Sequence, residues 1–297
     1  MLDKILVPLD GSVAAEAILP HVRRLLRRKD SEVLLLRVAV PPPVEEQMSM
    51  IEASLAAARE YVGGIKERLE QQGVRARAEA RLGPPAGTIL EVAEEKNVSL
   101  IAMATHGRTG LKRALFGSVA EQVLRKSTAP VFVVRPFWSY ELQPPGRTEA
   151  RPFKGILVPT DRSEPSRAVL APAIEIARLF GARMVFLNVL EPGRDKAGDE
   201  GLARERLQEY ADQAKGLETA VVVDRGEAAK TILDNARFHG CDLIAMTTHG
   251  RSGLSRMVVG SVTEKVLRDA ALPLLVVRAA KVKAKKTAAK AAGKGAK

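Results

Sequence analysis

Two copies of the same short segments run through this sequence, and this repetition limits the architectures open to it. A segment that ends in Pro-x-Asp occurs at residues 5–10 and again 151 positions later, at 156–161. A segment containing Thr-His-Gly-Arg occurs at 103–111 and again 143 positions later, at 246–254. Solenoid repeats are roughly 20–50 residues long. The chain of 297 residues is therefore expected to contain two copies of one domain, the second shorter in its middle.

Each copy alternates short apolar runs with amphipathic segments. In the first copy, strands are predicted at residues 4–9, 32–39, 75–82, 98–104 and 130–135, and helices at 13–28, 49–72, 86–97 and 118–126. The run Val33-Leu34-Leu35-Leu36 is continuous rather than alternating, which is typical of strands covered on both faces. The order of elements predicts an α/β fold, with a doubly wound, five-stranded parallel sheet in each copy.

The boundaries of the parts follow from composition. A first domain is expected at 1–136, a linker containing Pro144-Pro145-Gly146 at 137–152, a second domain at 153–279 and a basic tail at 280–297. Residues 281–297 hold seven Lys and no acid, which leaves +5 of the net charge of +12 for the rest of the chain. A tail of this composition is predicted to be disordered. It either binds nucleic acid through phosphates, without sequence specificity, or only keeps the protein in solution.

Several classes of protein are excluded or disfavoured. The single cysteine, Cys241, allows neither an intrachain disulfide nor a cysteine-based zinc cluster, and we expect it to be buried. No phosphate loop, Gly-x-Gly-x-x-Gly fingerprint or Gly-x-Ser-x-Gly nucleophile motif is present. No run approaches the roughly 18 apolar residues that cross a membrane, and the N-terminus predicts a strand rather than a signal peptide. We therefore expect a cytoplasmic protein without membrane contact.

An aspartate follows the first strand of each copy, at Asp10 and Asp161. In open α/β sheets, ligands bind beyond the carboxyl ends of the strands. A carboxylate there can accept hydrogen bonds from ribose hydroxyls. It can equally serve the start of the helix that follows, where Asp or Ser caps backbone amides. The sequence leaves both interpretations open.

The last helix of each copy starts with Gly-Ser-Val, at 117–119 and 260–262. Ser followed three residues later by Glu predicts a capping box. A helix N-terminus without such a cap attracts phosphate, because its amides and its dipole favour an anion. The two possibilities compete for the same donors. The preceding His-Gly loop adds a second place where a glycine backbone can approach an anion.

These segments together resemble the ATP-binding branch of the universal stress protein family. The motif of that branch is Gly, two residues, Gly, nine residues, Gly, then Ser or Thr. Gly107 and Gly117-Ser118 match it in the first copy, and Gly250 and Gly260-Ser261 match it in the second. The first Gly of the motif is replaced by Ala104 and by Thr247.

The resemblance implies a Rossmann-like fold of the adenine nucleotide alpha hydrolase type, and ATP as the cofactor, with or without Mg²⁺. The residues implied for the first copy are Pro8, Asp10, Val38 and Met103 around adenosine, and His106, Gly107, Gly117, Ser118 and Val119 around the phosphates. Their counterparts in the second copy are Pro159, Asp161, Val189, Met246, His249, Gly250, Gly260, Ser261 and Val262. The two methionines are equally compatible with a core role. The two histidines are expected to contact phosphate or the loop, since no partner for acid–base catalysis recurs.

The function implied is that of a nucleotide-dependent regulator in a stress response. A scaffold that binds no nucleotide and acts by association is the first alternative, because of Ala104 and Thr247. A slow ATP hydrolase is the second, and no general base is identifiable for it. Because family members dimerise through their last strands, segments 131–134 and 274–277 are expected to pair within the chain as a pseudo-dimer, with a homodimer as a further option. We expect tighter nucleotide binding in the first copy, since Thr247 is bulkier than Ala104.

Overall fold

A computed structural model describes residues 2–26, 30–41, 48–105, 117–136, 152–193, 195, 198–248 and 259–279. Four predicted site residues lie outside these ranges: His106, Gly107, His249 and Gly250. Linker residues 137–151 and the basic tail also lie outside them.

The first copy contains the five predicted strands. Its elements are β1 (Lys4–Leu9), α1 (Val13–Glu16), α2 (Leu19–Leu25), β2 (Glu32–Ala39), α3 (Met48–Gln71), β3 (Ala76–Leu82), α4 (Pro85–Glu95), β4 (Leu100–Ala104), α5 (Ser118–Lys126) and β5 (Val131–Val134). The prediction of one helix over 13–28 is wrong, because α1 and α2 are separate. Pro20 lies in the first turn of α2, where its missing N–H is tolerated and an uninterrupted helix would have needed that donor.

The second copy repeats this order. Its elements are β6 (Gly155–Pro159), η1 (Glu164–Val169), α7 (Leu170–Phe180), β7 (Arg183–Leu190), α8 (Asp199–Gln213), β8 (Thr219–Arg225), α9 (Ala228–Phe238), β9 (Leu243–Thr247), α10 (Ser261–Asp269) and β10 (Leu274–Val277). The helix α8 has 15 residues where its counterpart α3 has 24, which accounts for the shorter middle of the second copy.

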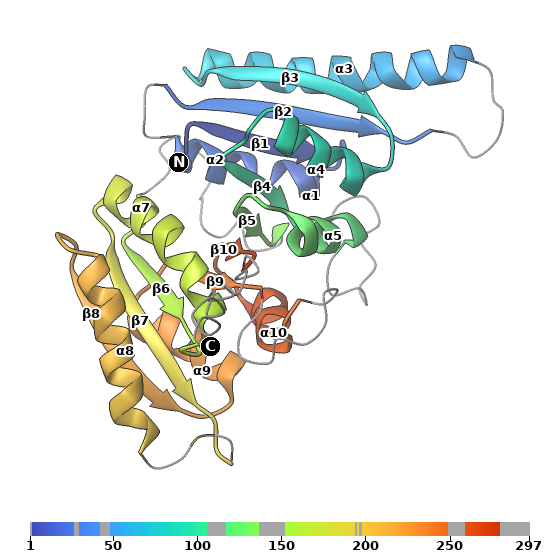
Figure 1. The fold of residues 1–297 in the computed structure, drawn as a ribbon. Helices are drawn as coiled ribbons and strands as arrows, with labels where there is room; N and C mark the ends of the chain where they lie inside the picture. The colour runs from blue at the N-terminus through green and yellow to red at the C-terminus, as the bar shows by residue number, and fades with distance from the viewer. Residues whose placement is uncertain are drawn as a thin grey trace, which may run out of the picture.

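The ten strands of the described residues form one sheet, in the order β3-β2-β1-β4-β5-β10-β9-β6-β7-β8 (Figure 1). Strands within each half run parallel, whereas β5 and β10 are antiparallel, with Leu275 opposite Phe132. The expected pairing of 131–134 with 274–277 is therefore confirmed. Each of these two strands covers an edge that the other copy would otherwise expose.

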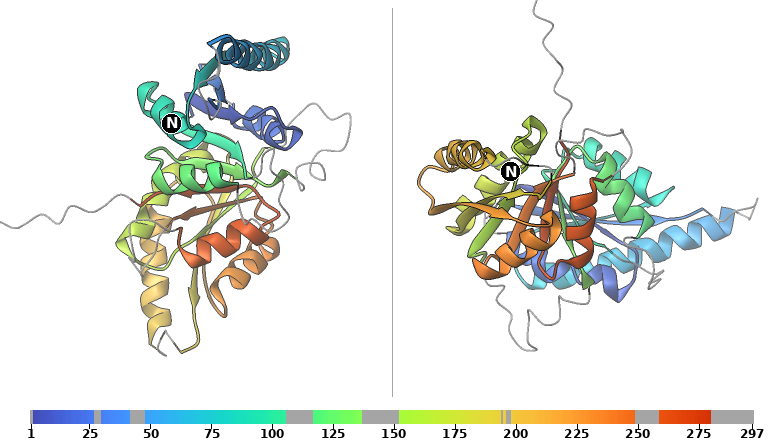
Figure 2. Two further views of the ribbon diagram at one scale, coloured as in Figure 1. Left: turned by 90° about the vertical axis from the view of Figure 1, so that its right-hand side faces the viewer. Right: turned by 90° about the horizontal axis from the view of Figure 1, so that it is seen from below.

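Helices cover both faces of the sheet (Figures 1 and 2). One apolar core contains residues of α1, α2, α3, α7 and α8, and the other contains residues of α4, α5, α9 and α10. Val33 and Leu35 belong to the first core, and Leu34 and Leu36 belong to the second. The continuous apolar run of β2 is thus explained by burial on both sides.

Aromatic and charged side chains join the two copies beside the central strands. The ring of Phe153 lies 6.2 Å from that of Phe132 and 5.0 Å from that of Phe180, in edge-to-face geometry. The guanidinium of Arg24 lies 3.4 Å from the centre of the Phe153 ring and forms an ion pair of 2.5 Å with Asp242. These contacts tie α2 and β5 of the first copy to Phe153 and Asp242 of the second.

Two expectations about the chemistry of the chain can be compared with the structure. Cys241 is buried, as predicted, and burial raises the pKa of its thiol to about 11. Among the helices of the described ranges, none has the length and apolar character needed to cross a membrane.

Candidate functional site

A pocket of about 750 Å³ opens at the carboxyl ends of β1, β2 and β4. In the sheet, β1 lies between β2 and β4, so the winding direction changes between β1 and β4. Ligands of open α/β sheets bind at such a switch point. The volume lies within the range of roughly 300–1,000 Å³ that is usual for small-molecule sites.

The pocket brings together every described site residue predicted for the first copy. These are Pro8, Asp10, Val38, Met103, Gly117, Ser118 and Val119. It also contains residues that the sequence analysis missed, chief among them Arg37, Tyr61, Pro85 and Ile89. Ser54, Ala58 and Tyr61 recur at helical spacing on α3, which is the signal that could have placed this face of α3 on the pocket.

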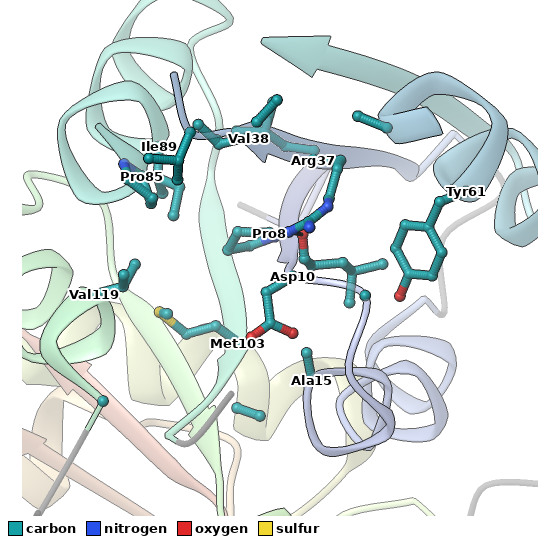
Figure 3. A pocket seen from close by; sticks show the side chains of 18 of the residues that line it. Pro8, Asp10, Ala15, Arg37, Val38, Tyr61, Pro85, Ile89, Met103 and Val119 are labelled. Carbon is teal, nitrogen blue, oxygen red and sulfur yellow. Dashed lines mark hydrogen bonds between the residues drawn. The ribbon is translucent and has the colours of Figure 1, made fainter. Parts of the chain in front are cut away.

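The pocket has an apolar side and a polar side (Figure 3). The apolar side holds Val38, Pro85, Ile89, Met103 and Val119, and the polar side holds Asp10, Arg37 and Tyr61. Such a division suits a ligand with an apolar ring at one end and polar groups elsewhere.

Asp10 belongs both to the pocket and to the turn that follows β1. Its Oδ1 accepts hydrogen bonds from the backbone N of Ser12 at 3.0 Å and from Ser12 Oγ at 2.6 Å. Ser12, not Asp10, is the N-cap of α1, since its Oγ accepts from the N–H of Ala15. The two interpretations of this aspartate are therefore compatible, because the turn orients the carboxylate at the pocket wall.

Arg37 and Tyr61 hold the polar side in place. Arg37 Nη1 donates to the carbonyl of Leu9 at 3.4 Å, and the Tyr61 hydroxyl donates to Glu16 Oε1 at 3.0 Å. Burial, followed by the neighbouring Glu16 carboxylate, raises the pKa of Tyr61 far above its ordinary value. Tyr61 is therefore a neutral hydrogen-bonding group at physiological pH.

The N-terminus of α5 forms the far end of the pocket. Its N-cap is Gly117, in extended backbone geometry, and in the described structure no side-chain hydrogen bond caps this end. The predicted capping box is wrong, because Ser118 is the first helical residue and the carboxylate of Glu121 pairs with Arg125 instead. The first-turn amides of α5 are thus without an N-cap side chain, and their dipole favours an anion.

A second, smaller pocket of about 150 Å³ occupies the same place in the second copy. The described site residues predicted there all line it: Pro159, Asp161, Val189, Met246, Gly260, Ser261 and Val262. Helix α10 likewise has a glycine, Gly260, as its N-cap. The backbone frame of the first site is therefore repeated.

A buried ion pair lies at the second pocket. Arg162 Nη2 lies 2.9 Å from Asp195 Oδ1, and Arg162 Nη1 donates to the carbonyl of Asp199 at 3.1 Å. Asp195 Oδ2 also accepts from the backbone N of Glu191 at 2.9 Å, and its side chain is only 4% exposed. Arg162 has a left-handed backbone, with φ of 66°, at the position where the first copy has Gly11, with φ of 81°. The second copy thus has a long, positively charged side chain where the first copy has glycine.

Hydroxyl side chains replace apolar ones in the second pocket. Thr160 Oγ1 and Ser166 Oγ lie 2.8 Å apart, and Thr263 Oγ1 donates to the carbonyl of Thr247 at 2.8 Å. The first copy has smaller or apolar residues at these four positions: Leu9, Ala15, Ala120 and Ala104. The expectation that Thr247 narrows its site is consistent with this pattern, although three other substitutions and the ion pair accompany it.

Within the described ranges, no group of three or more His, Cys, Asp and Glu side chains is arranged to hold a metal ion. The chemistry offered by the described part of the first pocket is therefore recognition through apolar contacts, a carboxylate, a guanidinium and helix amides.

Fold and pockets define the class of protein: a tandem α/β protein of two doubly wound domains, with a ligand-sized pocket at the switch point of the first. The model of the universal stress protein family matches residues 1–135 and 152–278, and the chain belongs to that family.

Relatives agree with this assignment. A universal stress protein of Methanocaldococcus jannaschii is 37% identical over 138 residues, which cover 44% of this chain and 81% of the relative. A universal stress protein of Mycolicibacterium smegmatis is 24% identical over 297 residues, covering 92% of this chain and 96% of the relative. The crystal structure of a universal stress protein from Archaeoglobus fulgidus has 24% identity and a TM-score of 0.75, and the match covers 94% of this chain and 100% of that one. This last similarity supports the tandem fold.

Proposed function

We propose that the first copy binds ATP or a related adenine nucleotide, and that the protein acts as a nucleotide-dependent regulator in a stress response. The observation that carries the proposal is the pocket of about 750 Å³, which combines an apolar slot with the N-terminus of α5. An adenine ring suits the first and a chain of phosphates the second. Membership of the universal stress protein family and the Gly107, Gly117-Ser118 motif support the same ligand.

The residues suggest how each part of the nucleotide is held. Val38, Ile89 and Met103 offer apolar surface to the base. The Asp10 carboxylate accepts hydrogen bonds from ribose hydroxyls, and its orientation is set by Ser12. Gly117 has no side chain to block the approach of phosphate to the first amides of α5. Mg²⁺ would bind together with the nucleotide, since it is commonly held by one or two carboxylates and by substrate phosphates.

The second copy is proposed to hold no nucleotide under the same conditions. Its pocket of about 150 Å³ is smaller than the usual range for such ligands. Two carboxylates line it that the first pocket lacks: Asp195, which is paired with Arg162, and Glu191, which adds a negative charge unfavourable to phosphate. The proposal is therefore one nucleotide per chain, bound by the first copy.

A pair of glycine variants tests this assignment. Gly117→Asp places a carboxylate at the N-cap of α5, where Asp is a favourable cap for the same amides that would bind phosphate. We expect isothermal titration with ATP to show one site in the wild type and none in Gly117→Asp. The matched variant Gly260→Asp makes the same change in α10 and is expected to leave the titration unchanged.

Native mass spectrometry of the purified protein supplies an independent count of bound nucleotide. Two equivalent sites in the wild type would contradict the proposal, and so would loss of binding in Gly260→Asp alone. A wild-type protein that binds no adenine nucleotide would favour the scaffold function instead. Phosphate release by the wild type that Gly117→Asp abolishes would point to the slow hydrolase.

A further inference from the structure

The sheet ends in two outer strands, β3 and β8, which are equivalent in the two copies but differ in chemistry (Figure 1). In β3, every second residue is charged: Arg77, Glu79 and Arg81. The equivalent residues of β8 are Ala220, Val222 and Asp224. Charged side chains on an outer strand discourage pairing with another chain.

An ion-pair network occupies the β3 edge. Arg77 lies 2.5 Å from Glu32 on the neighbouring strand, and Arg81 pairs with Glu79 and, at 2.9 Å, with Glu95 of α4. A strand that paired with β3 would have to displace or desolvate these groups. This edge is therefore protected in the way that soluble β-sheet proteins commonly use.

The β8 edge has three consecutive valines, Val221, Val222 and Val223, all partly exposed. Val221 and Val223 pack towards the core beneath α8, and Val222 packs towards the core beneath α9. A shallow groove runs along this strand, lined also by Phe238, whose side chain is 84% exposed. The middle of the edge is thus apolar and β-branched, and Arg204, Asp224 and Asp234 add charged side chains along the groove.

The backbone of β8 offers hydrogen-bonding groups on its outer side. The N–H of Met184 donates to the carbonyl of Glu218, and the N–H of Gly226 donates to the carbonyl of Leu190. Even-numbered residues of β8 therefore direct their backbone groups towards β7, and Thr219, Val221 and Val223 direct theirs outward. Within the described part of the chain, β7 is the one strand paired with β8.

We propose that β8 is a homodimer interface, where a second copy of this chain pairs antiparallel with it and extends the sheet across a twofold axis. Because the outward groups belong to odd-numbered residues, only registers that place odd opposite odd can form. Centring the axis on Val222 places Val221 opposite Val223 and Thr219 opposite Arg225. Both subunits then contribute the same valines to the contact, as a twofold interface requires.

Neighbouring registers are less favourable. Centring on Val221 would place Glu218 opposite Asp224, and like charges directly opposite each other are destabilising. Centring on Val223 would place Val222 opposite Asp224, whereas centring on Val222 places the smaller Ala220 there, so less apolar surface meets the carboxylate. The register centred on Val222 is thus the most self-complementary of the three.

A second copy is favoured over a foreign peptide because this sheet already joins equivalent halves in the same way. At the centre of the molecule, β5 and β10 pair antiparallel through aliphatic residues, with Val131 opposite Val276 and Val133 opposite Leu274. Pairing of β8 with β8 repeats that arrangement at the end of the sheet. The inference does not depend on nucleotide binding.

Sedimentation velocity of the full chain across a wide concentration range tests the proposal, and we expect a dimer. Val222→Glu installs the residue that β3 carries at the equivalent position, Glu79, so the fold tolerates it there. At the twofold axis the two new carboxylates meet, and we expect a monomer. Val222→Thr keeps a neutral, β-branched side chain, and we expect it to remain dimeric.

Ala80→Glu makes a comparable change on the β3 edge, and we expect the dimer to persist. Circular dichroism of each variant shows whether its fold is retained. A wild type that stays monomeric overturns the proposal, even if an extended peptide binds to it. A folded Val222→Glu that remains dimeric also overturns it. Loss of the dimer in Ala80→Glu would move the interface to the other edge and do the same.

Discussion

In both copies a Pro-x-Asp segment, a valine of the second strand and a glycine-capped helix surround the same point of the sheet, yet the pockets measure about 750 and 150 Å³. The strand order and the glycine N-caps are shared, so the difference arises from side chains and from the segment after the second strand, which leads to the 24-residue α3 in one copy and to the 15-residue α8 in the other. Gly11 is replaced by Arg162, and Ala15 and Ala120 are replaced by Ser166 and Thr263. One fold thus offers a ligand-sized cavity in one half and a filled, acidic one in the other.

The polar side chains that are present only in the second pocket form ion pairs and hydrogen bonds within the protein. Arg162 is compensated by Asp195, and the hydroxyl of Thr263 by a main-chain carbonyl. These are intramolecular partners at places where the first copy has room for a ligand. The second copy therefore uses its site for its own stability, and the first keeps its site open, as is common when function and stability compete for the same groups.

The largest expected effect concerns the buried ion pair. Asp195→Ala leaves the Arg162 guanidinium, whose side chain is 15% exposed, without its main counterion. Removing one partner of such a pair costs about 3–5 kcal/mol. We expect the free energy of unfolding, measured with urea, to fall by about 3 kcal/mol, at the low end of that range because Arg162 keeps its contacts with Asp199.

A second substitution distinguishes loss of the pair from loss of packing. Arg162→Gly in the Asp195→Ala background removes the unpaired cation and restores the residue type that the first copy has at this left-handed position. We expect the double variant to regain most of the lost stability. Lys66→Ala, which breaks the exposed pair with Glu70 on α3, serves as the control, with a change below about 0.5 kcal/mol. An Asp195→Ala protein as stable as the control would show that the pair contributes little.

The next effect exchanges pocket residues between the copies. Ala120→Thr brings into the first pocket the side chain that the second copy has at Thr263, where the hydroxyl donates to a main-chain carbonyl. The fold already accommodates this geometry, so stability should change little. Filling a tight site costs about 1–3 kcal/mol, and we expect ATP affinity in isothermal titration to fall roughly tenfold to hundredfold.

The reciprocal variant Thr263→Ala is the matched control, and we expect it to leave ATP affinity unchanged. If Ala120→Thr binds ATP as the wild type does, the nucleotide does not approach the first turn of α5. That result would place the phosphates elsewhere, while the Gly117→Asp titration would still report whether the first copy binds nucleotide at all.

Much of the fold followed from local sequence. The inner strands are buried apolar runs, and β1 and β2 begin and end where predicted. The repeat revealed the two-domain plan, and family behaviour then suggested the pairing of β5 with β10. The division between α1 and α2 could have been found from Pro20. The N-cap of α5 could have been found from Gly117, since glycine is also favoured at N-caps.

The differences between the two pockets could not be predicted in the same way. Arg162 and Asp195 are 33 positions apart, and neither residue is unusual for a loop. Their pairing depends on how the segment after β7 returns over the end of the sheet, which is a tertiary property. Tyr61 and Ile89 likewise reach the first pocket from helices whose faces periodicity reveals, while their register against the strand ends is set only by packing.

The smallest effect per measured step, about 1.4 kcal/mol for each pH unit, concerns the junction of the two copies, where His21 of the first copy is equivalent to Pro172 of the second. His21 is buried, and its ring lies 6.2 Å from that of Phe132. Burial, followed by the charge of Arg24, lowers the pKa of His21 to about 4, from an ordinary value of 6.5. At this position of the junction, the first copy therefore has a side chain that can be protonated and the second copy does not.

The direction of the pH effect follows from which state binds the proton. Between pH 6.5 and about 4, the unfolded chain binds a proton at His21 and the folded chain does not, so acid favours unfolding. The free energy of unfolding should fall by about 1.4 kcal/mol for each pH unit within this window, and His21 should contribute no slope above it. We expect urea unfolding of His21→Gln and His21→Leu to lose this slope relative to the wild type, whatever each substitution costs at neutral pH. Equal slopes in all three proteins would show that His21 binds its proton equally well in the folded and unfolded chains, and would contradict the lowered pKa.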